Sequence, residues 1–266
     1  MKSKSMLQNR DSDPGFVFQE AILNTLYGGN IRRSPISLKA VDHIDQQRAL
    51  AINKERFADA SDFTFTFVGS FTEEELKPYL EEYIASLPAL KREEKAVDLG
   101  IVEPAKGVEK IVYKGKEEKA QVRLSYYGDY NYDALDNLTF KALQGVLSIR
   151  LLERLREEES GVYGTGAQVS TSKYPTNRYS LHIGFGTNVN QYPSLIASAL
   201  DELAKIKKDG PTQLVLDKFV IEQKRQFELQ QKENRFWMGQ LSNAYQLNED
   251  PAYVNKYLSD LEKITP

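Results

Sequence analysis

The sequence predicts an α+β fold, in which helices pack on one face of a mixed, mostly antiparallel sheet. Segments with an apolar residue at every second position, typical of strands, are interspersed with segments whose apolar residues recur every three or four positions, typical of helices. The strands come mostly in pairs, and their spacing is too irregular for a doubly wound parallel sheet. The predicted strands cover residues 62–69, 109–113, 120–127, 162–171 and 179–185.

The first 35 residues are predicted to contain one short helix followed by an irregular stretch. A short helix is predicted over residues 15–27, and the pair Gly28-Gly29 ends it. The next stretch is irregular, since Pro35 disfavours a helical conformation at Ser34. We therefore expect residues 1–35 to be separate from the one α+β domain that is predicted over residues 36–266.

The next part of the chain combines a helix, a strand and a helix. A helix is predicted over residues 45–57, and the strand at 62–69 places three phenylalanines on one face. Thr72 and Glu75 form a capping box that begins a helix reaching about residue 86. Residues 88–107 have charges, a proline and no clear period, and we expect a surface connection there, with a possible internal linker.

The C-terminal part contains the longest periodic pattern. Residues 133–158 carry an apolar stripe at helical spacing, and the two strands after them are separated by the turn-rich segment SKYPTNR. Gly210-Pro211 separates two further helices. The helices predicted after the last strand cover residues 193–208, 212–234, 235–247 and 251–263.

Composition excludes several kinds of site. The chain has 266 residues, no cysteine and two histidines, so disulfides, thiol nucleophiles and cysteine zinc sites cannot form. His43 and His182 are far apart in the sequence, and no H-x-x-E-H motif exists. The net charge of −3 gives no electrostatic reason to expect a nucleic-acid partner. No apolar run approaches the ~20 residues that span a bilayer, and the first residues do not resemble a signal peptide.

The densest polar segment, residues 153–160, lies between the long helix and a strand. It could simply be a solvated helix end. It could also be functional, because Arg156 lies in the last helical turn and Tyr163 at the start of the strand. If the corner between them folds back, both can project to one side of the sheet edge. A guanidinium and a phenol can then hold a peptide carbonyl or an oxyanion, although neither is a general base at neutral pH.

Other candidates have plainer explanations. His182 shares a strand face with Ser180 and Gly184, and we expect a structural or solvent-facing histidine rather than a metal ligand. His43 lies in a polar segment that could hold an adventitious metal ion, although a loop residue is the simpler interpretation. The glycines of residues 161–166 follow a helix and precede a strand, which is the reverse of a phosphate-binding loop.

Three blocks of sequence, in order, resemble the pitrilysin/insulinase-type zinc metallopeptidases, in particular their bacterial zinc-protease branch. In LLERLREEESGVYGTGAQVS, as in that family, a long helix ends in Leu-Arg and a tyrosine follows seven positions after the arginine. FADASDFTFTFVGSFTEEELKPYLEEYIASLPAL is similar to the family's strand-glycine-helix block, and residues 209–251 are similar to its late helices. The resemblance covers roughly residues 45–266.

The resemblance implies a clam-shell architecture of two homologous halves. The N-terminal half carries H-x-x-E-H and zinc, and the C-terminal half is metal-free and closes over the substrate. This chain lacks the zinc motif and so resembles the C-terminal, metal-free region, with residues 1–35 as the tail of a preceding homologous domain. Arg156 and Tyr163 are then substrate-binding residues. No catalytic residue and no metal ligand is expected in this chain, and zinc is expected in the absent catalytic half.

The resemblance implies that the chain binds peptide and closes the chamber over the substrate. It also implies that the parent protein is a zinc metalloendopeptidase, whereas this chain alone is expected to be inactive. The expected partners are peptide substrate and the N-terminal catalytic half, either in the same polypeptide or in a zinc-bearing partner chain. The family branch suggests the periplasm or cell envelope. Two alternatives stay open: a catalytically silent scaffold or binding subunit that partners a separate zinc-bearing chain, and an unrelated α+β interaction domain.

Overall fold

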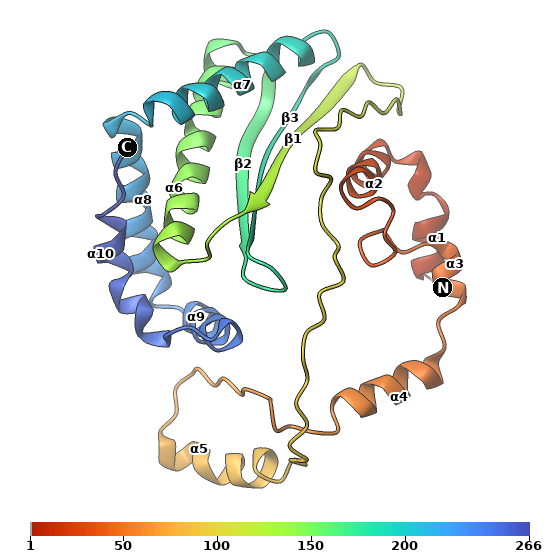
Figure 1. Cartoon of the computed structure of the whole chain (residues 1–266), viewed down its shortest axis with the longest axis vertical. Helices are drawn as coiled ribbons and strands as arrows, with labels where there is room; N and C mark the ends of the chain where they lie inside the picture. Colours follow the sequence, from red (N-terminus) through yellow and green to blue (C-terminus); the bar gives the residue numbers. More distant parts are fainter. Residues whose placement is uncertain (1) are drawn as a thin grey trace. The chain divides into compact units, whose positions relative to one another are not determined.

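The computed structural model of the protein describes residues 2–266. Two compact units are present, one formed by Met1–Phe63 with Glu73–Glu117 and the other by Thr64–Thr72 with Glu118–Pro266. The fold combines many helices with a three-stranded antiparallel sheet, which confirms the α+β class (Figure 1).

The sheet belongs to the second unit and contains strands β1 (Lys119–Asp129), β2 (Val162–Ser172) and β3 (Arg178–Asn188). The strand order is β1-β3-β2, and both neighbouring pairs are antiparallel. His182 at the centre of β3 pairs with Ser125 on β1 and with Gln168 on β2. These three strands confirm the predictions for residues 120–127, 162–171 and 179–185, and each is one to four residues longer than predicted.

The helices of the second unit also follow the prediction closely. The long helix is α6 (Ala134–Leu151), and its last two turns form a π-helix, η3 (Leu152–Glu158). One predicted helix ends early, at Gln230 instead of residue 234, and another divides into η4 and α10. The remaining elements are α7 (Tyr192–Asp209), α8 (Gln213–Gln230), α9 (Asn234–Leu247), the 3-10 helix η4 (Pro251–Lys256) and α10 (Tyr257–Leu261).

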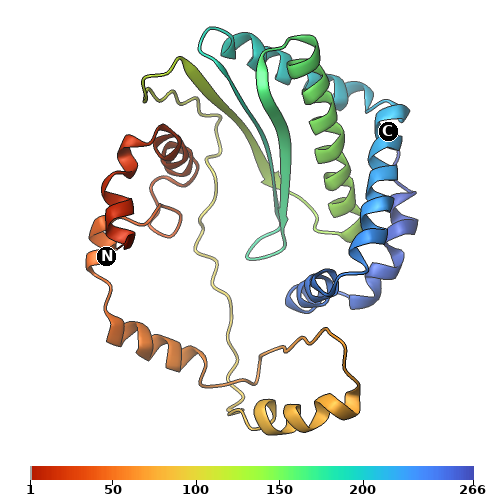
Figure 2. The ribbon, with the colours of Figure 1, turned by 180° about the vertical axis from the view of Figure 1, so that it is seen from behind.

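The core of the second unit lies on one side of the sheet. Leu147, Leu151 and Leu155 recur every four residues and are fully buried against the sheet and α7. The other side of α6 packs on α8 and α10, where a Cβ on Gly145 would lie 2.4 Å from the Phe219 ring. Figures 1 and 2 show α6 and α7 on the same side of the sheet. The prediction that helices cover one face is confirmed.

The first unit is helical. Two of its helices match the prediction: α2 (Pro14–Tyr27), which begins at the cap Asp13 and ends at Gly28 with φ of +58°, and α4 (Gln46–Arg56). The helix predicted over residues 72–86 is observed as α5 (Glu73–Tyr79) and the π-helix η2 (Leu80–Ile84). Three short elements were not predicted: α1 (Lys2–Gln8), η1 (Arg10–Ser12) and α3 (Leu38–Asp42).

Two predicted strands are wrong. Residues 62–69 and 109–113 are irregular in this structure and belong to no sheet. An alternating apolar pattern gives a segment one apolar face, but a strand also needs a neighbouring strand for its backbone hydrogen bonds. Within the part of the chain that the structure describes, neither segment has such a neighbour.

Candidate functional site

The corner between η3 and β2 contains both predicted site residues. Ser160 has a φ of +49°, a left-handed conformation that is uncommon for a residue with a side chain. Its N–H donates to the carbonyl of Arg156 at 3.1 Å, and the N–H of Gly161 donates to the carbonyl of Leu155 at 2.9 Å. The two bonds span four and six residues, each one residue more than in the Schellman motif of an α-helix, which agrees with the wider π-helical turn of η3, and they satisfy its last carbonyl groups. The predicted helix stop at Ser160-Gly161 is confirmed.

Gly161 fixes the corner to the rest of the second unit. A Cβ on this residue would lie 2.6 Å from Cδ2 of Leu195 on α7, so only glycine fits without a shift. Its carbonyl accepts a buried hydrogen bond of 2.6 Å from the hydroxyl of Thr187 on β3. The backbone of the corner is therefore held by contacts with α7 and with the central strand β3.

A β-bulge determines how Tyr163 is presented. Val162 pairs with Thr187 and Thr165 with Phe185, so β2 advances three residues while β3 advances two. Val162 is buried in the core, whereas Tyr163, which follows it within the bulge, is 75% exposed. Bulges commonly redirect a side chain at the end of a strand. The phenol is accordingly directed away from the face that α6 and α7 cover.

Arg156 lies on the helical side of the same corner. Its side chain is 54% exposed, and its ion pair with Glu157 is long, at 3.9 Å. The surrounding turn has π-helical geometry, with the N–H of Glu159 donating to the carbonyl of Arg154 at 3.2 Å. Short π-helical segments are rare in proteins, but those that occur are often found at functional sites. Both Arg156 and Tyr163 thus reach solvent from one corner, whose backbone is held by α7 and β3.

An ion-pair network next to the corner was not predicted. The carboxylate of Glu202 on α7 is buried and accepts two hydrogen bonds from Arg150 on α6, at 3.2 and 3.0 Å. Arg150 also donates to Glu153 at 2.8 Å, and Lys205 donates to Glu202 at 3.0 Å. Burial lowers the pKa of Arg150, but the hydrogen bonds and charge of Glu202 outweigh it and raise this pKa above its usual value. The network joins η3 to α7.

One signal in the sequence could have revealed this network. The buried residues of α7 are Leu195, Ala199 and Glu202, which share a helical stripe. A charged residue within an apolar stripe needs a buried partner of opposite charge.

The face of the sheet opposite the core is polar. Because paired residues on antiparallel strands point to the same side, Arg123, Ser125 and Tyr127 of β1 share a face with His182 of β3 and Gln168 of β2. At its centre, Nδ1 of His182 lies 3.0 Å from the hydroxyl of Ser125. The bulge directs Tyr163 to this same side of the sheet.

The residues present do not fit a zinc site. Among the described residues, no three His, Cys, Asp or Glu side chains come together as metal ligands. Nδ1 of His43 contacts the carbonyl of Lys39 at 2.6 Å, and His182 contacts Ser125, so both imidazoles have local protein partners.

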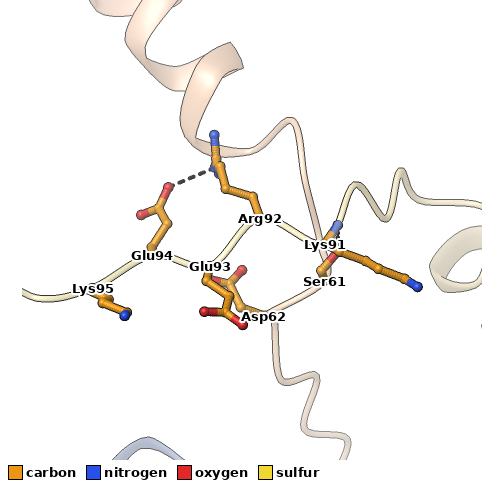
Figure 3. A pocket seen from close by; sticks show the side chains of 7 residues that line it. All are labelled: Ser61, Asp62, Lys91, Arg92, Glu93, Glu94 and Lys95. Atoms are coloured by element: carbon orange, nitrogen blue, oxygen red, sulfur yellow. Dashed lines mark hydrogen bonds and ion pairs between the residues drawn. The ribbon is translucent and has the colours of Figure 1, made fainter.

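A cavity of about 460 Å³ in the first unit is lined by side chains of both charges (Figure 3). Beside it the buried carboxylate of Asp59 accepts hydrogen bonds from the backbone N–H groups of Leu90 and Arg92, at 2.8 and 2.7 Å, and from the hydroxyl of Ser61 at 2.5 Å. The Ser61 hydroxyl and these N–H groups lower the pKa of Asp59 well below its usual range. The carboxylate therefore holds two chain segments together, and we interpret this cluster as structural.

Comparisons with known proteins identify the family of the chain. The sequence profile described as "Peptidase M16 inactive domain" matches residues 50–220. A protein of Arabidopsis thaliana named "Zinc protease PQQL-like" is 21% identical over 258 residues, which cover 92% of this chain and 27% of that protein.

Two solved structures have the same fold. The periplasmic protease PqqL of Escherichia coli matches with a TM-score of 0.86 and 19% identity, over 99% of this chain and 29% of that one. The peptidase M16 inactive domain of Pseudomonas fluorescens matches with a TM-score of 0.78 and 18% identity, over 99% and 63% of the two chains.

These matches define the family and the relative size of the chain. The chain spans only about a quarter to a third of the A. thaliana and E. coli proteins. No helix among the described residues is long and apolar enough to cross a membrane. Because the profile covers more than half of the sequence, the chain belongs to the peptidase M16 inactive-domain family.

Proposed function

We propose that this chain is the non-catalytic C-terminal region of a zinc metallopeptidase, which binds peptide substrate and closes the chamber over the catalytic half. Membership of the inactive-domain family supports the first part of the proposal. The absence of an H-x-x-E-H motif from the sequence agrees with it, because water activation then has to come from another part of the protein.

The observation that carries the binding role is the supported corner with two exposed polar side chains. Arg156 offers several N–H donors in a planar fork, and Tyr163 offers one hydroxyl. Together they can hold the carbonyl oxygens of an extended peptide, or stabilise negative charge that develops on such an oxygen. The polar face of the sheet, with Ser125, Gln168 and His182, continues from Tyr163 and offers further hydrogen-bonding groups along the peptide.

The partners follow from this role. The catalytic half, in the same polypeptide or in a separate chain, supplies the zinc, and the substrates are peptides or small unfolded proteins. The parent protein acts in the periplasm or cell envelope, a proposal supported by its likeness to a protein described as the periplasmic protease PqqL. The division into a tail of residues 1–35 and a domain of residues 36–266 stays a prediction.

The test is substitution at the corner in the intact parent protein. We expect Arg156→Ala and Tyr163→Phe each to lower kcat/KM for peptide hydrolysis roughly 10- to 100-fold, because each removes one group that holds the carbonyl. Matched controls are Arg225→Ala and Tyr245→Phe, which change exposed side chains on α8 and α9. The melting temperature should not change in any of the four variants.

Two results would count against the proposal. Unchanged kcat/KM in both corner variants removes the role of Arg156 and Tyr163. An intact protein that binds peptide but hydrolyses none, even with zinc, favours the catalytically silent binding subunit instead.

A further inference from the structure

Strand β2 is an edge strand, since β3 is its one neighbouring strand within the described part of the chain. Backbone groups on such an edge have no partner strand, and an extended peptide can add to the sheet through them. Tyr163, one of the two residues of the proposed peptide site, lies in this same strand. From the corner, a peptide could therefore follow either the outer edge of β2 or the polar face of the sheet.

The hydrogen bonds of Ala167 and Val169 show which backbone groups of β2 point outward. In an antiparallel pair, alternate residues direct both backbone groups to the partner strand, and the residues between them direct both groups away from it. Ala167 bonds through its N–H and its carbonyl to a side chain of α6, and Val169 does so through its N–H. Both residues therefore face the outer edge, near the centre of the strand.

Two side chains of α6 occupy these outward positions. The hydroxyl of Ser148 accepts a hydrogen bond from the N–H of Ala167 at 3.1 Å, and it donates to the carbonyl of the same residue at 3.3 Å. The side-chain oxygen Oε1 of Gln144 accepts from the N–H of Val169 at 2.8 Å. Figures 1 and 2 both show α6 beside β2. The helix thus supplies the hydrogen-bonding groups that a neighbouring strand would supply.

The spacing of these residues fits a helix that runs alongside the strand. Four residues of an α-helix rise about 6 Å, and two residues of a strand rise about 6.7 Å. Gln144 and Ser148 are four residues apart, whereas Val169 and Ala167 are two apart. The two side chains therefore reach successive outward positions. Their order is reversed because α6 and β2 run in opposite directions.

An added peptide strand would have to break these contacts. It needs the outward N–H and carbonyl groups of β2 for its own hydrogen bonds, and near the centre three of these groups are bonded to α6. Displacing Gln144 and Ser148 would deprive their partly buried polar groups of these partners, which is unfavourable. Gln168 and Ser170 are exposed on the polar face, and a peptide can reach them without any such displacement.

We propose that Gln144 and Ser148 close the β2 edge, so that a peptide held at the corner runs over the polar face of the sheet and does not add to β2 as a strand. Both are positioning residues, because they act on the peptide through the backbone of β2. The path of the peptide rests on the proposed function, whereas the closure of the edge does not depend on it.

Hydrogen exchange in the intact parent protein tests the closure. At an open edge, outward amides exchange much faster than the amides between them, which bond to the partner strand. With the edge closed, we expect the amides of Ala167 and Val169 to exchange within about tenfold of the amide of Gly166, which points to β3. Exchange of both amides more than about 100-fold faster than that of Gly166 would mean that the edge is open.

Matched variants of the intact protein show whether the two side chains are responsible. Gln144→Met with Ser148→Ala removes both polar groups at nearly constant volume, and it should speed the exchange of the two outward amides by at least about tenfold. Gln168→Met with Ser170→Ala makes the same changes on the polar face of β2. This control should leave the two rates within about threefold of the wild type.

Gln144→Glu is the conservative variant. Its carboxylate can still accept from the N–H of Val169, so the exchange of this amide should stay slow, whereas Gln144→Met alone should speed it. If the double variant does not fold, these two single variants and the wild-type rates decide whether the edge is closed.

A photoreactive peptide tests the path. The probe is an unstructured peptide with benzophenone side chains at successive positions, bound to the intact protein in the presence of a chelator that prevents hydrolysis. Mass spectrometry should place its cross-links on the polar face, in the segments around Ser125 of β1 and Ser180 of β3. Residues 141–148 of α6, which border the β2 edge, should carry few of them.

The outcomes separate the inference from the proposed function. Cross-links mainly on residues 141–148 mean that the peptide adds along β2, which overturns the inference and leaves the proposed function intact. A peptide that forms no cross-link with the second unit overturns the path and the proposed function together, and the exchange rates then decide the closure by themselves. Unchanged exchange in the double variant means that Gln144 and Ser148 do not close the edge.

Discussion

Gly161 is the residue on which the candidate site most directly depends. Its missing side chain lets the corner approach Leu195, and its carbonyl is bonded to Thr187. Gly164, three residues later in the bulge, has open space where a Cβ would be. The two glycines therefore differ in steric demand although they lie in one short segment.

This difference predicts the outcome of two alanine substitutions. We expect Gly161→Ala to lower the free energy of unfolding of the second unit by about 1–3 kcal/mol, because the added methyl group overpacks the contact with Leu195. Gly164→Ala should change it by less than about 0.5 kcal/mol. Urea unfolding followed by the fluorescence of Trp237, the single tryptophan, measures both. Equal effects would contradict the steric explanation.

At this scale the sequence predicted the turn but not its geometry. The apolar stripe, the serine and the glycine located the end of the helix between Arg156 and Tyr163, and this is confirmed. The bulge that exposes Tyr163 was not predicted, since it depends on the pairing of β2 with β3 rather than on local preference. The substrate-binding role of the two residues stays a prediction.

Among the elements, α6, η3 and α7 share an ion-pair network that centres on the buried carboxylate of Glu202, in addition to their apolar contacts. Arg150→Met leaves Glu202 buried with Lys205 as its remaining ion-pair partner. We expect the free energy of unfolding of the second unit to fall by about 3 kcal/mol, because removing one partner of a buried pair leaves a poorly compensated charge. Urea unfolding with Trp237 fluorescence again provides the measurement.

Lys218→Met is the matched control for this change. Lys218 pairs with Glu153 at 3.5 Å, and both side chains are partly exposed. Exposed pairs contribute about 0–1 kcal/mol, so this variant should stay within that range. If both methionine variants lose the same stability, the burial of Glu202 is not the cause.

The elements differ in how far sequence could predict them. Strands β1, β2 and β3 were predicted from their apolar patterns. The predictions hold because each strand pairs with a neighbour inside this chain, so that local pattern and tertiary contact agree. The strand predicted over residues 62–69 has an equally regular pattern and is wrong for this structure. Pattern reports which face of a segment is apolar, whereas pairing depends on the presence of another strand.

For the whole molecule, composition and motif order were more informative than any single site. Two isolated histidines exclude a local two-histidine zinc motif, and three blocks in order indicated the metallopeptidase family, which is confirmed. The boundary between the two compact units could not be predicted, because both contain ordinary amphipathic elements. The two units differ in burial, because the buried apolar residues of the described chain all lie in the second unit. Burial depends on tertiary packing, which the sequence pattern does not report.

The last prediction concerns the activity of the chain by itself. We expect the purified 266-residue chain, with zinc added, to hydrolyse no peptide. Peptide hydrolysis by this family requires an activated water, and the chain has neither an H-x-x-E-H motif nor, among its described residues, a cluster of metal ligands. Arg156 and Tyr163 can donate hydrogen bonds that orient a carbonyl, a role that does not activate water.

The assay compares the chain with the intact parent protein on an unstructured fluorogenic peptide, with zinc and with a chelator. The parent should hydrolyse the peptide and lose this activity with the chelator, whereas the chain should match the blank in both conditions. Peptide binding by the chain, measured by fluorescence anisotropy, should persist with the chelator, because Arg156 and Tyr163 need no metal to donate hydrogen bonds. Zinc-dependent turnover by the chain, abolished by the chelator, would mean that these 266 residues hold a metal site, and the assignment of a non-catalytic role would then be wrong.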